Sequence, residues 1–310
     1  MVNSIKIYKN FQIKKNHRGS IILIGNFDGV HLGHQKLFSL AKKYKKKYRV
    51  KIGVLTFEPM PKMFFDSTLK NFRISSLNQK ISLLKKQSVD FIITKKFNKE
   101  FSKTKSIKFI NQIICKKLNP KFIFVSNNFK FGNKREGNVS QLVQYETSNN
   151  YKIIKPQPLL INKKIVSSSL IRNFLKNGKL KKVNKFLNRK WSIEGRVQKG
   201  KQLGKKIGFP TANIDIKNYV LAKPGVYVVR ALRHNSTKYI RGIANLGYRP
   251  TFNGKKILLE VHLFNFSGNL YNKYLTVEFL NFIRKEKKFK NIDQLKKQIK
   301  VDLKIAKKIK

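Results

Sequence analysis

Short apolar runs alternate with amphipathic stretches through the first half of the chain. Residues Ile21 to Ile24 form a continuous apolar run that predicts a buried strand, and the stretch from Gly33 to Tyr48 predicts the following helix. Further strands are predicted over Val50–Phe57, Val89–Thr94, Phe122–Val125 and Ile153–Ile154, and further helices over Leu77–Gln87, Ile107–Leu118 and Ser168–Lys176. This α/β alternation predicts a parallel sheet covered on both faces, with ligands at the carboxyl ends of its strands.

From Trp191 onward, short β-patterned runs are separated by Gly, Pro and Asn, which predicts a small antiparallel β-barrel. The runs are Ile193–Val197, Gly225–Leu232, Ile243–Leu246, Leu258–Phe266 and Leu275–Phe282. A C-terminal helix should follow, with Asn291 as its N-cap and Gln294 three residues later. Its apolar stripe is predicted to contain Ile292, Leu295, Ile299, Leu303 and Ala306. We expect two domains, residues 1–187 and residues 188–310.

The composition changes this picture little. The 310 residues suit two domains, and the net charge of +56 comes from lysines spread through helices, loops and both ends. Codons rich in A and T favour Lys, Asn, Ile and Phe together, so we expect loose, salt-sensitive binding to polyanions and no specific nucleic-acid partner. No apolar run approaches the ~18 residues of a membrane span, and no secretory signal is visible. The single cysteine, Cys115, should be a small buried hydrophobe, and a reduced cytoplasmic location fits.

The segment from Gly25 to His34 joins the first buried strand to its helix. A helix N-terminus presents unpaired N–H groups and a positive dipole end, so it attracts phosphate. Gly29 and Gly33 permit close backbone approach, while His31 and His34 can each donate a hydrogen bond to an anion. A structural turn with two surface histidines and a metal-binding pair are the alternatives.

This segment resembles the nucleotidyltransferases that carry a His-x-Gly-His motif. The fuller pattern resembles the bacterial bifunctional riboflavin kinase/FMN adenylyltransferases, also called FAD synthetases. Matching segments follow in the same order from about residue 21 to residue 306. They are Thr56–Pro61, Val125–Gly132, Ser167–Arg172, Gly195–Val197, Gly200, Gly204–Asn213, Lys223–Tyr227, Gly242–Thr251, Leu258–Phe264 and Leu270–Tyr271. Ser126, Asn127 and Lys130 depart from the family, which often has Gly, an acid and Arg there.

For the first domain, the resemblance implies transfer of an adenylyl group from ATP to FMN. The FMN phosphate is already an anionic nucleophile, so the protein must position and neutralise charge rather than supply a base. The resemblance assigns that task to His31, His34, Ser168 and Arg172, and nucleotide or flavin contacts to Gly25, Asn26, Phe27, Gly33 and Asn128. Phe65 and Phe131 either line the flavin pocket or pack in the core.

For the second domain, the segment from Gly200 to Asn213 resembles the riboflavin kinase signature that ends in Pro-Thr-Ala-Asn. Its glycines should form a loop over ATP, and its lysines should meet phosphates; the expected contacts are Gly200, Lys205, Gly208 and Pro210. Thr211 and Asn213 offer oxygens two residues apart, which together with ATP phosphates could hold Mg2+. The family's base, which deprotonates the ribityl hydroxyl of riboflavin, maps onto Glu260.

The sequence therefore predicts a two-activity enzyme that uses ATP as co-substrate and Mg2+ to convert riboflavin to FMN and FMN to FAD. Two rival hypotheses remain at this point. One is a riboflavin kinase whose adenylyltransferase domain has drifted, and the other is a polyanion-binding protein on the same fold. The sequence leaves the oligomeric state open. Arg284, Glu286 and Phe289 either enclose riboflavin or anchor the last helix.

Overall fold

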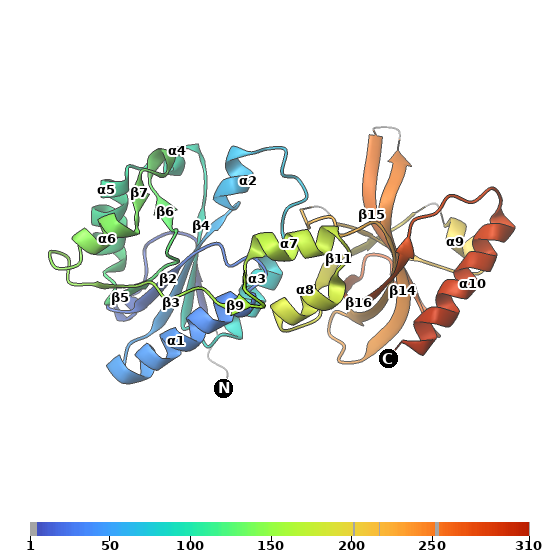
Figure 1. Ribbon diagram of the computed structural model, residues 1–310, viewed down its shortest axis with the longest axis horizontal. Helices are drawn as coiled ribbons and strands as arrows, with labels where there is room; N and C mark the ends of the chain where they lie inside the picture. The colour runs from blue at the N-terminus through green and yellow to red at the C-terminus, as the bar shows by residue number, and fades with distance from the viewer. Residues whose placement is uncertain (1–4, 201, 217, 252–253, 310) are drawn as a thin grey trace. The chain divides into compact units, whose positions relative to one another are not determined.

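The computed structural model describes residues 5–200, 202–216, 218–251 and 254–309 (Figure 1). The chain forms two compact units. Unit 1 contains the chain up to Leu69 and the stretch Leu77–Ser167, and unit 2 contains Lys70–Ser76 and the chain from Ser168 onward.

Unit 1 is built on a parallel sheet, as the alternation of strands and helices predicts. Its strands are β1 (Lys6–Tyr8), β2 (Ile21–Ile24), β3 (Ile52–Glu58), β4 (Phe91–Lys96), β5 (Phe122–Phe124), β6 (Lys130–Phe131), β7 (Gly137–Asn138), β8 (Lys152–Ile154), β9 (Leu160–Ile161) and β10 (Lys164–Ile165). Its helical elements are η1 (Lys15–His17), α1 (Leu32–Tyr48), α2 (Pro61–Phe65), α3 (Leu77–Lys85), α4 (Lys99–Ser102), α5 (Ser106–Lys108), the π-helix η2 (Phe109–Leu118), η3 (Asn133–Arg135) and α6 (Val139–Gln144).

The order of strands in this sheet is β1-β4-β3-β2-β5-β8, and every neighbouring pair is parallel. Strands β3 and β4 follow β2 on one side of it, and the chain then returns to the other side of β2, where β5 and β8 lie. The carboxyl ends of β2 and β5 therefore flank the topological switch point, where ligands of open α/β sheets bind. The segments after these two strands are Gly25–His34 and Val125–Gly132, which both carry predicted site residues.

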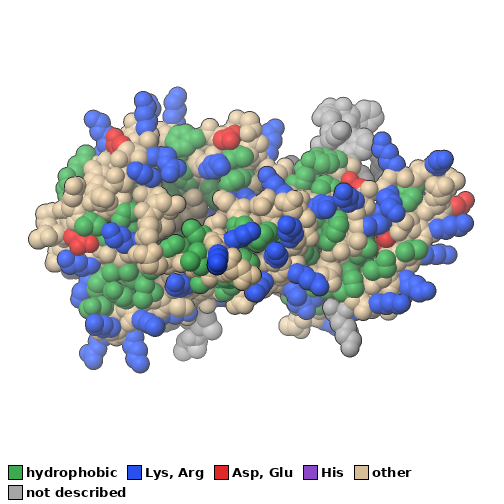
Figure 2. Space-filling view, in the orientation of Figure 1, with side chains coloured by type: hydrophobic (Ala, Val, Ile, Leu, Met, Phe, Trp, Pro, Cys, Tyr) green, Lys and Arg blue, Asp and Glu red, His purple; other side chains and the backbone are tan. Residues whose placement is uncertain are grey.

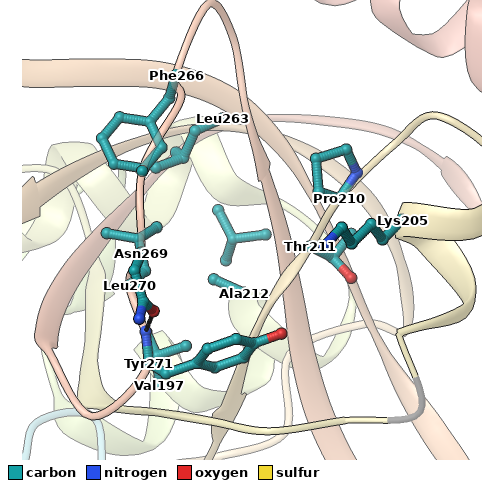
Figure 3. Close-up of a pocket in the computed structure, with 12 residues that line it drawn as sticks. Val197, Lys205, Pro210, Thr211, Ala212, Leu263, Phe266, Asn269, Leu270 and Tyr271 are labelled. Carbon is teal, nitrogen blue, oxygen red and sulfur yellow. Dashed lines mark hydrogen bonds between the residues drawn. The ribbon is translucent and has the colours of Figure 1, made fainter.

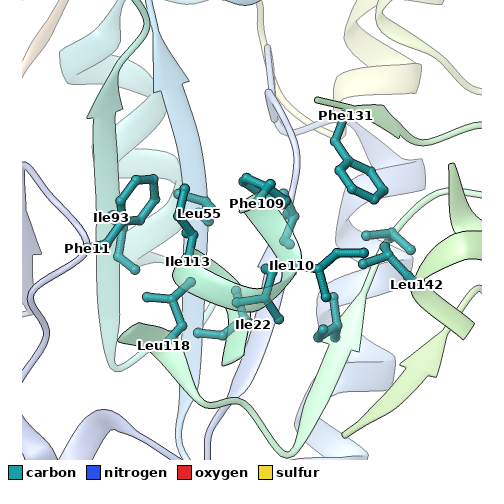
Figure 4. Close-up of a cluster of buried hydrophobic side chains, with 14 of the residues drawn as sticks. Phe11, Ile22, Leu55, Ile93, Phe109, Ile110, Ile113, Leu118, Phe131 and Leu142 are labelled. Carbon is teal, nitrogen blue, oxygen red and sulfur yellow. The ribbon is translucent and has the colours of Figure 1, made fainter. Parts of the chain in front are cut away.

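The four residues of β2 are buried on both faces of the sheet, with exposures of 0–3%. Alternation along the strand sends Ile22 and Ile24 to a core that includes Phe109 and Ile110 of η2 (Figure 4). Ile21 and Leu23 join the opposite core, which contains Phe38 of α1. Both faces are thus covered, as the continuous apolar run predicts. Cys115 is half-buried and packs against the first of these cores.

Unit 2 contains the predicted antiparallel barrel, closed in the order β11-β12-β15-β14-β13-β16. Its strands are β11 (Ser192–Gln198), β12 (Ala212–Asp215), β13 (Gly225–Arg233), β14 (Tyr239–Thr251), β15 (Gly254–Leu263) and β16 (Tyr274–Lys285), and its helices are α7 (Ser168–Lys176), α8 (Leu180–Leu187), α9 (Leu203–Lys206) and α10 (Ile292–Lys308). Five of the six strands were expected. The sixth, β12, begins at Ala212 within the Pro-Thr-Ala-Asn motif and extends two residues beyond it.

A short segment from the first half of the sequence, Lys70–Ser76, belongs to unit 2. The backbone N–H of Arg73 donates to Asn218 O at 2.8 Å, and its carbonyl accepts from Val220 N at 2.7 Å. The indole N–H of Trp191 donates to Ile74 O at 2.9 Å. Helices α7 and α8 also belong to unit 2, so the boundary between the two compact units lies at Ser168. The functional boundary near Leu187 stays a prediction.

Helix α10 begins as predicted, since Asn291 Oδ1 accepts from Gln294 N at 3.0 Å and Gln294 Oε1 accepts from Lys290 N at 3.2 Å. Ala306 is buried, and Ile299 and Leu303 pack against the barrel core. The first member of the predicted stripe is wrong, because Ile292 is 59% exposed. It is the first residue of the helix, ahead of the turns that contact the barrel.

Candidate active sites

The turn after β2 has an unusual backbone. Phe27, Gly29 and Val30 have φ angles of 47°, 77° and 38°, so two non-glycine residues occupy the left-handed region. Such conformations cost about 1–3 kcal/mol each and cluster at functional sites. Successive peptide N–H groups in turns of this kind form concave nests that bind anions. The turn leads directly into the N-terminus of α1, so the geometry suits phosphate.

The two histidines stack at the start of α1. Their ring centroids are 3.7 Å apart, with planes inclined by 17°. His31 is the N-cap, and its Nδ1 accepts a hydrogen bond from His34 N at 3.4 Å, which leaves its ring proton on Nε2. Burial, and secondly the nearby His31, hold the pKa of His34 well below its usual value. His34 is therefore neutral near neutral pH, and the alternative of two surface histidines is wrong for His31, which is 5% exposed.

Gly33 allows this arrangement. A Cβ atom at Gly33 would lie 3.0 Å from Val166 O and 3.2 Å from the His31 ring. Gly25 follows β2 directly, and its N–H donates to Leu55 O at 3.1 Å. The Asn26 carbonyl accepts from Thr56 Oγ1 at 3.3 Å, while Phe27 is buried and packs edge-on to His34. The segment Gly25–His34 is thus a connected turn and helix start at the switch point.

The remaining predicted residues of the first site are divided between the units. Asn128 follows β5 and is exposed, and its Oδ1 accepts from Ser126 Oγ at 2.9 Å. Ser168 and Arg172 lie on α7 in unit 2, and Arg172 stacks on the Phe72 ring at 3.7 Å and donates to Phe72 O at 2.8 Å. Their action beside the histidines stays a prediction. Phe72 was not singled out from the sequence, because only the fold brings residues 70–76 to α7.

Phe65 and Phe131, each expected either to line the flavin pocket or to pack in the core, differ in burial. Phe131 is 7% exposed and belongs to the hydrophobic core of unit 1. Phe65 is 66% exposed at the end of α2, where its ring lies edge-on to Phe64. Core packing therefore accounts for Phe131, while Phe65 offers an exposed aromatic face.

In the barrel, Glu260 of β15 lies opposite Asn213 of β12 on one side and Asn245 of β14 on the other. Residues directly opposite one another in antiparallel strands project from the same face. The three side chains therefore form a row across three neighbouring strands. Asn245 lies within a segment that matches the family, but the sequence alone gave no reason to single it out.

The described residues of the glycine-rich loop approach this row closely at Asn213. A Cβ atom at Gly200 would lie 1.9 Å from Asn213 Nδ2, and one at Gly204 would lie 2.5 Å from Phe209 O. Gly208 has a φ of 88°, a conformation that favours glycine. Among the described residues, the buried Oδ1 of Asn213 has no hydrogen-bond partner. An orphaned, buried amide oxygen two residues from the Thr211 hydroxyl fits a hard cation such as Mg2+.

Two cavities meet at this loop. The first, of about 350 Å3, is lined by Lys205, Pro210 and Thr211 on one side and by the aromatic rings of Phe266 and Tyr271 on the other (Figure 3). The second, of about 470 Å3, contains Glu260, Asn245 and Phe289 in its wall. Thr211 lines both cavities. A group held at Thr211 can therefore reach ligands in either.

The wall of the second cavity includes residues that precede α10 and residues of the helix itself. Arg284 donates through Nε and Nη2 to the carboxylate of the buried Asp302 at 2.7–3.1 Å. Asn245 Nδ2 lies 3.5 Å from Glu286 Oε1. Arg284 therefore anchors the helix and lines the cavity at once, so the two expected alternatives for it are compatible. His262 also lines this cavity, and its Nδ1 lies 2.9 Å from Pro210 O.

Lysine and arginine side chains are scattered over the face shown in Figure 2, with few acidic groups between them. In the parts of the chain that the structure describes, no group of three His, Cys, Asp or Glu residues could hold a metal ion. None of the described helices is both long enough and apolar enough to cross a lipid bilayer.

Two family models divide the chain between them. The FAD synthetase model matches residues 13–170, and the riboflavin kinase model matches residues 187–310. The chain belongs to the bifunctional riboflavin kinase/FMN adenylyltransferase family. A family member from Buchnera aphidicola subsp. Schizaphis graminum is 41% identical, with 96% of each chain covered. Another from Haemophilus influenzae is 39% identical, with 94% of each covered.

These findings confirm the resemblance seen in the sequence, and they favour a bifunctional riboflavin kinase/FMN adenylyltransferase over the two rival hypotheses. A solved structure described as a macrolide-efflux protein from Streptococcus pneumoniae also matches. Its TM-score is 0.85 at 28% identity, and the match covers 97% of this chain and 98% of that one. That likeness concerns the fold.

Proposed function

We propose that the barrel phosphorylates riboflavin from ATP and that the parallel-sheet unit then adenylylates FMN. The observation that carries the first step is the position of Thr211, which lines a cavity containing Lys205 and a second cavity containing Glu260. ATP would occupy the first cavity, with its adenine near the aromatic residues and its phosphates near Lys205. Riboflavin would occupy the larger, more apolar one.

In this arrangement, Glu260 accepts the proton of the ribityl 5′-hydroxyl while that oxygen attacks the γ-phosphorus of ATP and ADP leaves. Asn213 and Asn245 lie opposite Glu260 on the two neighbouring strands. They would orient the ribityl hydroxyl and the Glu260 carboxylate toward each other. Asn213 and Thr211 would supply the protein ligands of Mg2+, which when bound neutralises phosphate charge. The unpartnered Oδ1 of Asn213 supports this ligand assignment.

In the second reaction, a phosphate oxygen of FMN attacks the α-phosphorus of ATP, and pyrophosphate leaves. The strained turn of Gly25–Val30 and the N-terminus of α1 would bind the phosphates. His31 and the neutral His34 would donate hydrogen bonds through their ring N–H groups, and Ser168 and Arg172 would add further donors. Asn128, at the carboxyl end of the neighbouring strand, would contact the nucleotide or flavin.

One experiment tests both halves of the proposal. Purified protein is incubated with riboflavin, ATP and Mg2+, and the flavins are separated by chromatography over time. We expect FMN to appear first and FAD to follow. Supplying FMN in place of riboflavin isolates the second reaction, and a chain that forms FMN but no FAD would contradict the adenylyltransferase proposal.

A further inference from the structure

A lysine is buried behind the phosphate-binding turn of unit 1. Lys80 lies on α3 with its side chain only 3% exposed. Its Nζ donates to Thr56 Oγ1 at 3.2 Å and lies 3.8 Å from Glu58 Oε2. Burying an ammonium group costs several kcal/mol, so a lysine at this position requires polar partners around it. A side chain that merely filled this space would be apolar.

The hydrogen bonds of this lysine lead to the turn. An ammonium group only donates, so the Thr56 hydroxyl accepts from Lys80 and points its own proton at Asn26 O, 3.3 Å away. Asn26 directly precedes Phe27, whose φ of 47° begins the strained part of the turn. Strained backbone persists only where its surroundings over-determine it. The hydrogen bonds from Lys80 through Thr56 therefore fix the carbonyl of the residue directly before the strained part of the turn.

From this juxtaposition we propose that Lys80 is a positioning residue for adenylyl transfer. It pins the Asn26 carbonyl through Thr56, which holds the turn in its anion-binding shape. It also places a buried, weakly screened positive charge behind the site where negative charge develops on the departing pyrophosphate. The inference rests on the proposed function of unit 1 and adds a residue without substrate contact.

The test compares Lys80→Met with Lys85→Met, a matched substitution at an exposed lysine of the same helix. We expect Lys80→Met to lower kcat for FAD formation from FMN by roughly 10- to 100-fold, the size of effect that small misplacements produce. The KM for FMN should stay unchanged, because the lysine acts on the turn and the leaving group. Riboflavin phosphorylation by the same polypeptide should also stay unchanged, as it should for Lys85→Met in both reactions.

Kinase activity of the same polypeptide separates positioning from folding. Removing the lysine from a buried ion pair leaves Glu58 without this partner, so Lys80→Met should lower the melting temperature, and the assays are run well below the melting temperatures of both variants. Equal FAD formation by the two variants would overturn the proposal, as would loss of both activities in Lys80→Met. Wild-type protein that forms no FAD would instead refute the proposed function on which the inference rests.

Thr56→Val tests the hydrogen-bonded route itself. It removes the hydroxyl between Lys80 and Asn26 while the lysine charge remains. We expect FAD formation to fall, but by less than in Lys80→Met. A Thr56→Val variant with the wild-type rate would overturn the role of Thr56 in pinning the turn.

Discussion

At the scale of single residues, Glu260 carries the sharpest chemical prediction. Glu260→Gln keeps the shape of the side chain but removes its ability to accept a proton. We expect riboflavin phosphorylation to fall by roughly 10²- to 10⁴-fold, the usual contribution of a general base. FAD formation from FMN should continue at the wild-type rate, measured by chromatography on the same preparation. Equal loss of both activities in a folded variant would contradict two separate sites.

The stacked histidines give a prediction about pH. The lowered pKa of His34 means that below pH ~6.5 the unfolded chain binds a proton that the folded chain does not. Stability should therefore fall as pH drops through that region and be fully present above it. The pKa of His17 is also lowered, chiefly by burial. His17 therefore also makes the fold less stable as the pH falls.

Urea unfolding followed at several pH values between about 5 and 8 measures this effect. His34→Asn removes one titrating group, so its free energy of unfolding should depend less steeply on pH than that of the wild type. A residual slope should remain because His17 still titrates. A variant with the wild-type pH dependence would show that His34 is not held neutral in the fold.

At the scale of elements, the cap of α10 links stability to the kinase site. Asn291→Ala removes the bond to Gln294 N and should lower the free energy of unfolding by about 1 kcal/mol. Because Leu295, Ile299 and Asp302 of this helix line the larger cavity, the KM for riboflavin should rise. Urea unfolding and kinase assays check both effects. Asn291→Asp keeps the cap oxygen and should behave like the wild type, whereas a similar loss in both variants would contradict a capping role.

The elements also show why part of the fold was predictable. The short apolar run Ile21–Ile24 favours a strand covered on both faces, and the helix after it follows from the period of the apolar residues in that stretch. Strand β12 escaped prediction because its first two residues, Ala212 and Asn213, end a Gly- and Pro-containing motif typical of a loop. The stretch Ile107–Leu118 was predicted as a helix, but local apolar spacing did not show that most of it is a π-helix.

For the candidate sites too, local motifs were predictable and arrangements that depend on distant segments were not. A resemblance can assign Glu260 and Asn213, because each lies in a local motif. That they lie opposite one another, with Asn245 on the other side, depends on strand register between distant segments. The buried Lys80 carries no local signal at all, since it is one lysine among many and only the packing of α3 against β3 sets it apart.

At the scale of the whole molecule, charge is the dominant feature. The chain has 70 basic and 14 acidic side chains, so one-to-one pairing of every acid would still leave 56 cations. Repulsion among like charges destabilises the compact state more than the expanded one. We therefore expect the melting temperature to rise as sodium chloride shortens the Debye length from ~30 Å at 0.01 M to ~8 Å at 0.15 M. Thermal unfolding monitored by circular dichroism measures the shift.

The choice of salt separates general screening from a specific anion site. Screening depends on ionic strength, so potassium chloride should reproduce the sodium chloride curve at equal concentration. A phosphate-binding turn would instead respond to sulfate beyond its ionic strength, because an anion that binds only the folded state stabilises it by mass action. Lys80→Met should reduce that extra response to sulfate, while the rise of the melting temperature with chloride should stay the same. A melting temperature that did not respond to chloride would mean that the dispersed lysines impose no net repulsion on the fold.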